Sequence, residues 1–407
     1  NTTFDRPRLQ AAINDLLGRV GTISRAFVAI SDDQYGPPGT TFSFDARYPE
    51  YDFYWQDTWK VRPNLTFDLG LRWEIKLSPS DPRNRILRPE RPVVLGAPPS
   101  NTIRWVKGEL YDDDWNNFGP TIGFAWDPFG TGKTSIRANY RLAYDRVPTF
   151  LFSSFIFPTM PGIALPVINQ EFGQRGGRIR DGLPVLAPPA GLTPAQLRQP
   201  APFSTASIHV VDPSLRSAKT NMWGLSIQRE LAWKTVLELN YIGRRGVGLL
   251  GAYNINQAEI FQNGFLEAFR IVQAGGESDL INRLLEKDSR RRTGETGSQM
   301  LRRLFASTLN LNSVAALAAS LATRTEAGQP LVVASGFSPF FFFPFPQFSG
   351  GLVVLDSNDF STYHAFEAQI ARQLSRGLSF QFSYTFAKSL DTRSFDPTFT
   401  TAAGGTA

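Results

Sequence analysis

Hydrophobic and polar residues alternate without a break over residues 65–76. The odd positions hold Leu65, Phe67, Leu69, Leu71, Trp73 and Ile75, and the even positions hold Thr66, Asp68, Gly70, Arg72, Glu74 and Lys76. Successive side chains of a β-strand point to opposite faces, so this period of two predicts a strand with one apolar and one polar face. In a soluble sandwich the apolar face meets a second sheet. In a transmembrane barrel it meets lipid, and the polar face lines a wet lumen.

Seven other segments repeat this pattern, at residues 51–60, 118–127, 133–145, 221–231, 233–243, 362–374 and 378–388. Short turns at 61–64, 128–132, 231–233 and 375–377 join the eight segments into four hairpins, and long loops at about 77–117, 146–220 and 244–361 join the hairpins. Strands of about ten residues with alternating short and long connections are typical of outer-membrane barrels. We therefore predict an all-β fold, an antiparallel transmembrane β-barrel of which about eight strands are visible, with long extracellular loops that carry short helices. A soluble β-sandwich is the alternative, although loops of this length argue against it.

This pattern divides the chain into three parts. Residues 1–50 form an irregular or weakly helical lead-in, residues 51–390 the barrel segment, and residues 391–407 the start of a further loop. The chain begins without Met and ends without a closing strand. We therefore expect a portion of a longer polypeptide and an incomplete barrel, with closure of eight strands into a small barrel as the alternative.

The long loops contain amphipathic and charge-free stretches. Residues 279–303 are charge-rich and amphipathic, which predicts a solvated helical decoration, with a membrane-surface helix as the alternative. Residues 147–170 and 329–355 carry no charge, but each run holds four prolines. Proline leaves backbone groups unpaired, so neither run is expected to span a bilayer as a helix.

The two faces of the predicted strands supply the candidate functional residues. Polar-face side chains of mixed charge suit a hydrated lumen, and the lumen candidates are Asp68, Arg72, Glu74, Arg137, Arg141 and Glu238. Amphipathic aromatic rings favour the headgroup depth of a bilayer. The candidates for lipid contact and an aromatic belt are Trp55, Trp59, Trp73, Trp126, Tyr140, Trp223 and Tyr241. An aromatic sandwich core is the alternative for the second set.

Composition narrows the chemistry. The net charge is only +6 and no basic block occurs, so nucleic acid is not an expected partner. The chain has no cysteine and two histidines, His209 and His364, which argues against catalytic triads and transition-metal sites. Residues 132–134 read Gly-Lys-Thr but lack the earlier P-loop glycine. The run at 112–114 reads as an acidic loop tip rather than a cation site. We expect no cofactor, no metal and no enzymatic activity.

The strand sequences also resemble a known family. Tyr54–Lys60 (YWQDTWK), Pro63–Thr66 (PNLT) and Leu69–Glu74 (LGLRWE) are similar to the barrel signature of TonB-dependent receptors. Asn116–Gly130 (NNFGPTIGFAWDPFG), Gly132–Thr134 and Tyr144–Arg146 resemble the branch of Oar-like proteins with a carboxypeptidase-regulatory-like domain, and Phe380–Asp391 (FQFSYTFAKSLD) resembles a later strand of that branch. The similarity lies in strand segments between residues 50 and 390 and not in the long loops.

This resemblance implies a large barrel in the outer membrane of a Gram-negative bacterium, closed by an N-terminal plug and energised through the TonB complex. The expected function is that of a receptor and transporter whose loops capture an unknown ligand and whose lumen passes it inward. The expected partners are outer-membrane lipid, the ligand and, through a plug, TonB. A structural or adhesive barrel protein that transports nothing is the alternative.

Overall fold

The computed structural model describes residues 5–393 except Thr205 and Arg376. The turn expected at 375–377 therefore lies partly outside the described residues. So does most of the loop expected from residue 391 onward. The fold below refers to the residues that are described.

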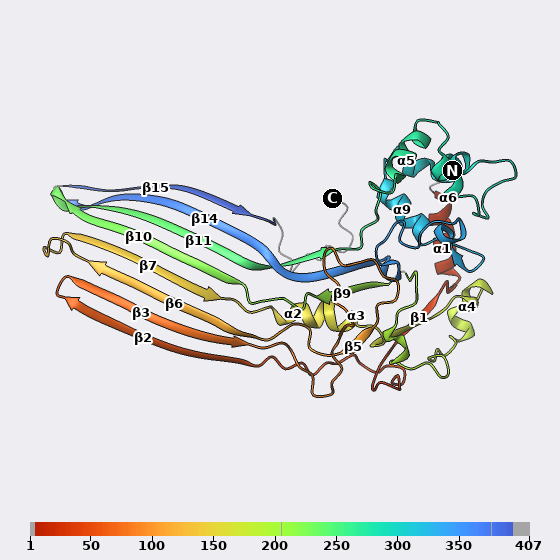
Figure 1. Cartoon of the computed structure of the whole chain (residues 1–407), viewed down its shortest axis with the longest axis horizontal. Helices are drawn as coiled ribbons and strands as arrows, with labels where there is room; N and C mark the ends of the chain where they lie inside the picture. Colours follow the sequence, from red (N-terminus) through yellow and green to blue (C-terminus); the bar gives the residue numbers. More distant parts are fainter. Residues whose placement is uncertain (1–4, 205, 376, 394–407) are drawn as a thin grey trace.

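Eight long antiparallel strands form one continuous sheet (Figure 1). They are β2 (Glu50–Arg62), β3 (Leu65–Lys76), β6 (Asp114–Trp126), β7 (Thr134–Tyr144), β10 (Lys219–Leu231), β11 (Thr235–Asn254), β14 (Gly351–Ser375) and β15 (Leu378–Asp391). Each strand bonds its neighbour in sequence, and the order across the sheet is β15-β14-β11-β10-β7-β6-β3-β2. The four predicted hairpins are confirmed. The outer edges of β2 and β15 bond no other described strand, so the sheet is open.

The short turns follow from local chemistry. In the β6–β7 turn, Gly130 and Gly132 have φ of 65° and 72°, which glycine adopts without a steric penalty. The Asp127 carboxylate closes this turn by accepting a hydrogen bond from the Gly132 N–H at 2.7 Å. In the β10–β11 turn, Trp233 and Lys234 take left-handed φ of 59° and 56°. The strand expected from residue 233 therefore begins at Thr235.

Two strands are longer than the alternation predicts. β11 continues to Asn254 and β14 begins at Gly351, so both enter the loop expected at 244–361. In this extension β14 pairs with the parallel strand β9 (Ser207–Val211). Residues 352–355 (Leu-Val-Val-Leu) are all buried. A strand that is buried on both faces reads as a continuous apolar run, and the alternation used for prediction disappears there.

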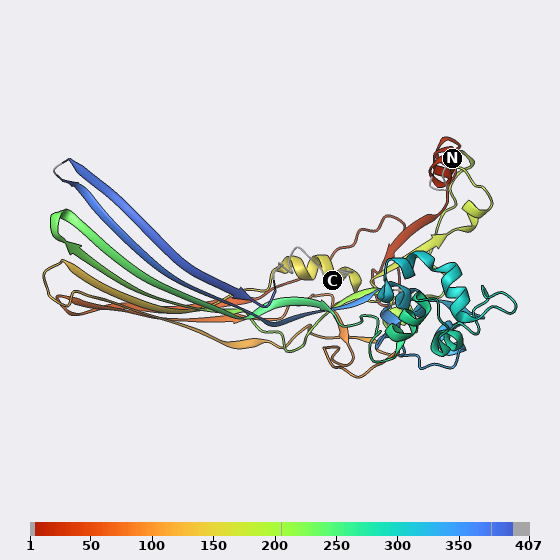
Figure 2. The same ribbon diagram turned by 90° about the horizontal axis from the view of Figure 1, so that it is seen from above.

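The long loops lie at the end of the sheet opposite the short turns (Figure 2). The lead-in contains α1 (Asp5–Leu16) and β1 (Ile23–Val28), and β1 pairs antiparallel with β8 (Ala164–Asn169). The first long loop holds the small hairpin β4 (Leu87–Pro89) and β5 (Trp105–Lys107). These loops share a hydrophobic core with the extended ends of β11 and β14, in which Trp105 packs edge-on against Phe348 at 5.3 Å between ring centroids.

A cluster of short helices fills the last long loop. Its helices are α5 (Phe265–Gln273), α6 (Asp279–Leu284), α7 (Gly297–Leu304), α8 (Ala306–Asn310), α9 (Val314–Ala322) and α10 (Leu331–Ala334). They bury a second hydrophobic core around Phe269, Leu284 and Leu317. The apolar sides of α6 and α7 face this core, because Ile281, Leu284 and Leu301 are fully buried. The amphipathic stretch at 279–303 therefore packs on its own loop, and its apolar side is not available to a membrane surface.

The remaining described elements are short. They are α2 (Thr149–Leu151), a π-helical turn (Phe152–Ile156), α3 (Phe157–Thr159), α4 (Glu171–Gln174), and the two-residue strands β12 (Thr325–Glu326) and β13 (Gln329–Pro330). Single 3₁₀ turns occur at Ile179–Asp181, Gln196–Arg198, Ala232–Lys234 and Pro346–Phe348. Among the described residues, no helix has both the length and the apolarity needed to cross a membrane. The prediction of long loops that carry short helices is confirmed.

Candidate functional site

One face of the sheet gathers all six predicted lumen candidates. Paired residues in neighbouring strands share a face, and so do residues two apart within a strand. Asp68 pairs with Gly123, and Gly123 pairs with Asn139. Asp68, Arg72 and Glu74 of β3 therefore lie on the same face as Arg137 and Arg141 of β7. The ladder continues through β10 to Glu238 of β11. We call this side the polar face.

The opposite side, here the apolar face, carries all seven predicted aromatic residues. Trp55, Trp59 and Trp73 pair with Leu71, Phe67 and Phe118, and Tyr241 pairs with Leu225 and Phe366. The same register places Trp126, Tyr140 and Trp223 on this side. Trp55 and Trp59 are each 58% exposed. Large rings at this exposure have no second sheet against them, so the sandwich-core alternative is wrong.

Ion pairs order one end of the polar face. Arg72 contacts Asp52 at 2.9 Å and Glu74 at 3.0 Å, and Lys76 contacts Glu74 at 2.6 Å. Glu74 is 6% exposed, so its charge depends on these two cations. Asp68 accepts a hydrogen bond from the Thr58 hydroxyl at 2.8 Å. The charged side chains of this group therefore have polar or oppositely charged partners within the sheet.

Arg137 and Arg141 differ from that group. Neither makes an ion pair or a side-chain hydrogen bond with a described residue, while Glu238 accepts one from Asn240 at 3.0 Å. Two open recesses of about 330 and 570 Å³ run along the sheet beside these arginines. Small residues deepen them, and at Gly224 an added Cβ would lie 2.6 Å from the Asn139 amide oxygen. The polar face thus carries two open recesses, and a guanidinium group without an ion-pair partner among the described residues borders each of them.

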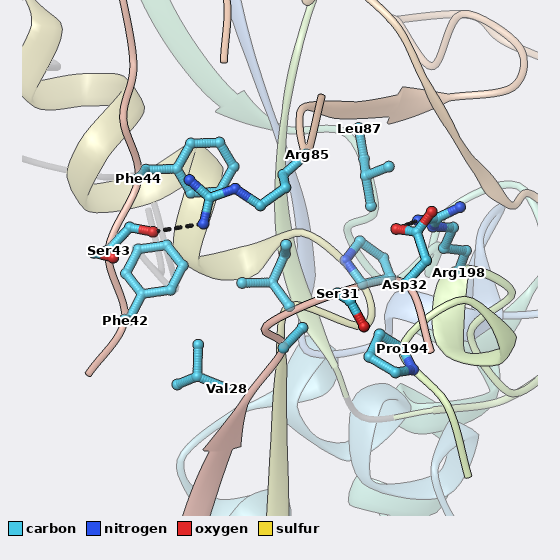
Figure 3. A pocket seen from close by; sticks show the side chains of 14 residues that line it. Val28, Ser31, Asp32, Phe42, Ser43, Phe44, Arg85, Leu87, Pro194 and Arg198 are labelled. Carbon is cyan, nitrogen blue, oxygen red and sulfur yellow. Dashed lines mark hydrogen bonds and ion pairs between the residues drawn. The ribbon is translucent and has the colours of Figure 1, made fainter. Parts of the chain in front are cut away.

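A third recess lies among the loops (Figure 3). Its walls come from residues 28–32, 42–44, 85–87, 161–163 and 194–198. Arg85 stacks over the Phe44 ring at 4.4 Å and donates to the Ser43 carbonyl oxygen at 2.8 Å. The space in this recess that the centres of water molecules can occupy is about 30 Å³. A water needs about 10–15 Å³ on this measure, so the recess accepts a few waters or a small chemical group.

Ion pairs close the other side of this recess. Asp32 contacts Lys107 at 2.7 Å and also contacts Arg198. Arg85 is held by Asp81 through its Nε at 2.8 Å. Residues 32, 85 and 198 are not among the sequence candidates, because they lie in irregular loops where no periodicity marks them. Only the folded loops bring them together.

The acidic run at 112–114 contacts other groups of the protein, and Asp112 lies 3.7 Å from the Arg216 guanidinium. Asp113 accepts a hydrogen bond from the Ser78 N–H at 2.9 Å, and Asp114 is buried at the start of β6. In the described part of the chain, no group of three or more His, Asp or Glu side chains is arranged to hold a metal ion.

Acid is expected to loosen the lead-in from the loops. The hydrogen bond from Lys107 is the main cause that holds the pKa of Asp32 below its ordinary value of 3.8, although partial burial opposes it. A lowered folded-state pKa gives stability that is present above the unfolded pKa and is lost as the pH falls through the folded value. Because the Asp32 side chain is 42% exposed, the effect is at most about 1 kcal/mol.

Asp32→Asn should reproduce this loosening at neutral pH, seen as faster hydrogen exchange of residues 28–36. Asp33→Asn is the matched control, because the Asp33 side chain makes no ion pair with a described residue. Equal exchange in both variants would contradict the role of Asp32.

The open sheet with one polar and one exposed apolar face, and with its long loops at one end, defines a transmembrane β-barrel domain. The family model described as an outer membrane beta barrel domain matches residues 15–406, and the chain belongs to this family. It is located in the bacterial outer membrane.

Solved structures with some similarity include the alcaligin outer-membrane receptor FauA from Bordetella pertussis, the outer-membrane transporter YddB from Escherichia coli and the siderophore receptor PirA from Pseudomonas aeruginosa. Sequence identities are 8%, 10% and 10%, and the TM-scores are 0.29, 0.34 and 0.28. The matches cover 85%, 85% and 84% of this chain but only 31%, 34% and 43% of those chains. The chain thus spans less than half of their length. No curated protein matches it.

Proposed function

We propose that this chain is the barrel portion of a TonB-dependent receptor, whose loops capture a ligand and whose plugged lumen passes it inward. The observation that carries the proposal is the polar face, on which Arg137 and Arg141 line open recesses without a described ion-pair partner. A hydrated lumen filled by a polar plug would supply partners to both arginines. The signature residues of the family resemblance fall on the hairpins β2–β3 and β6–β7 that build this face.

The proposal gives each face of the sheet a role. Asp68, Arg72, Glu74, Arg137, Arg141 and Glu238 line the lumen. Trp55, Trp59, Trp73, Trp126, Tyr140, Trp223 and Tyr241 contact lipid. The loop recess is too small for a large ligand, so within this proposal it contacts one small polar group of a ligand held by the loops as a whole. The Oar-like branch stays a prediction from the sequence.

A comparison of spent growth media tests transport without knowledge of the ligand. Mass spectrometry of the medium should find the same compound left behind by a strain lacking this protein and by a strain lacking TonB. Replacement of Arg137 and Arg141 by glutamate should also leave the compound in the medium, because it reverses the charge of the lumen surface. Trp55→Phe, on the apolar face, is the control and should permit uptake.

The alternative predicts a different result. A structural or adhesive barrel would leave the medium unchanged in the strain lacking this protein and in the variant of Arg137 and Arg141. No compound would then be left behind by both the strain lacking this protein and the strain lacking TonB. That outcome would overturn the transport function and leave the barrel assignment intact.

A further inference from the structure

Basic side chains gather on the apolar face near the loop end of β10, β11, β14 and β15. Trp223 pairs with Gly243, Gly243 with His364, and His364 with Lys388, which forms one row across the four strands. Arg245 lies two residues beyond Gly243 on the same face. Lys219 lies four residues beyond the row on β10. We call Lys219, Arg245, His364 and Lys388 the basic collar.

The spacing of the collar suits a shared anionic surface. Neighbouring strands are about 4.8 Å apart and alternate residues along a strand about 6.8 Å apart. The Cα atoms of Lys219 and Arg245 are then about 8 Å apart, and those of Arg245 and Lys388 about 12 Å. Long basic side chains at these distances can reach the same group of phosphates, because their methylene stems lie along the apolar surface and extend the charged ends toward one another.

The charge on this side has one sign. Over the paired stretches 219–231, 235–247, 360–372 and 378–391, the apolar face carries no aspartate or glutamate at any described position. On the polar face of the same stretches, four acidic residues accompany Arg244, namely Glu230, Glu238, Glu367 and Asp391. The cations of the collar therefore have no carboxylate to pair with on the apolar face of these four strands. A counter-charge for these cations would therefore come from outside this part of the sheet.

The collar also differs from the basic residues at the other end of the same face. Arg229, near the short turns, stacks over Phe129 at 5.3 Å, and Arg372 donates to the Ser375 carbonyl oxygen at 3.2 Å. By contrast, Lys219, Arg245 and Lys388 are exposed and make no ion pair or side-chain hydrogen bond with a described residue. Within these four strands, Arg229 and Arg372 thus contact neighbouring groups of the protein, whereas the three cations of the collar do not.

His364 is held in place within the collar. Its Nδ1 shares a hydrogen bond of 2.8 Å with the Tyr241 hydroxyl, and the Trp223 ring lies edge-on to it at 5.9 Å. The other ring nitrogen, Nε2, has no hydrogen bond from a described residue. This arrangement leaves one fixed donor or acceptor beside the three exposed cations.

We propose that the basic collar binds the phosphate groups of anionic lipids in the outer leaflet of the outer membrane. The loop end of the apolar band lies at the outer headgroup depth of this family's membrane, where hydrocarbon gives way to charged groups. Cations next to hydrocarbon need a counter-charge, and lipid phosphates supply it at this depth. Free phosphate would lack the acyl chains that cover Leu225, Phe366 and Phe386 just below the collar.

The site rests on the location in the outer membrane and not on transport. A loss of lipid binding would therefore leave ligand uptake in place, and a failure of the transport proposal would leave the collar in place. The two ideas can be tested separately.

Native mass spectrometry of the full-length protein with lipid A in detergent micelles tests the collar. The triple variant Lys219→Gln, Arg245→Gln and Lys388→Gln should bind lipid A at least about tenfold more weakly, since each cation near a lipid surface contributes about fivefold. The matched control removes three exposed cations from the polar face, with Lys60→Gln, Lys133→Gln and Arg244→Gln, and should bind as the natural protein does. Equal loss in both variants, or loss in neither, would overturn the proposal.

Two further arms keep the result decisive. The charge-conserving variant Lys219→Arg, Arg245→Lys and Lys388→Arg should retain lipid A binding, which distinguishes an effect of charge from an effect on folding. If the triple glutamine variant does not fold, the single Lys388→Gln variant should bind lipid A about fivefold more weakly. Inorganic phosphate should fail to displace lipid A. Displacement by inorganic phosphate would show a free-phosphate site and would overturn the assignment to lipid.

Discussion

Ile227→Arg is expected to lower the free energy of unfolding by about 2–4 kcal/mol, the cost of a basic side chain on the lipid face near the bilayer midplane. Ile227 lies on the apolar face of β10, pairs with Ile136 and Leu239, and is 37% exposed. An arginine at this position would find no carboxylate on the paired residues. Unfolding of the full-length protein in lipid bilayers by urea measures the loss.

Gln228→Arg is the matched control for that substitution. Gln228 is the next residue of the same strand and lies on the polar face, directly paired with Glu238. An arginine there gains a counter-ion in a hydrated setting, so the free energy of unfolding should change little. Equal destabilisation by the two substitutions would sink the assignment of the two faces to lipid and lumen.

Phe269→Ala is expected to destabilise the helical cluster by about 3–5 kcal/mol while the sheet stays intact. Phe269 is fully buried in the core formed by α5 to α10, and this core is separate from the one that joins the other loops to β11 and β14. Hydrogen exchange of the full-length protein should become faster throughout residues 265–334 and remain slow in β10, β11 and β14.

Phe261→Ala provides the comparison, because Phe261 is 74% exposed and its truncation creates no cavity. Exchange in this variant should match that of the natural protein. Faster exchange across the whole sheet in Phe269→Ala would show instead that the helical cluster and the barrel strands fold as one unit.

The sequence predicts the strands best where one face is polar and the other apolar. All eight strands, their pairing and the face of every candidate residue could be read from a period of two, because lipid and water impose opposite demands on alternate side chains. The same rule fails at Leu352–Leu355, where both faces are buried and alternation vanishes. It also fails at Trp233, whose aromatic ring suggests a strand although the backbone turns through a left-handed conformation.

The contacts within the loops cannot be predicted from periodicity. The contact of Asp32 with Lys107 and Arg198 joins three segments that no periodicity marks. A backbone hydrogen bond of 2.9 Å from the Ala195 N–H to the Asp32 carbonyl oxygen also holds the first and last of these segments together. The helical stretch at 279–303 is predictable as amphipathic. Its packing against α5 cannot be predicted in this way, because the sequence does not specify which surface the apolar side of a helix will contact.

The register of the sheet also sets how steeply its strands cross the bilayer. The row that begins at Lys60 of β2 passes from strand to strand to Thr385 of β15. Lys60 stands two residues before the end of β2 at Arg62, whereas Thr385 stands seven residues after the start of β15 at Leu378. The row therefore rises by about five residues, or roughly 17 Å, over seven strand spacings of about 4.8 Å.

This stagger corresponds to an inclination of roughly 25–30° between the strands and the axis of the barrel. Two residues in one row consequently sit at different depths, and depth has to be counted from each strand's own short turn. Hairpins added at either free edge would have to continue the same slope, about 0.7 residue per strand, for the wall to close on itself.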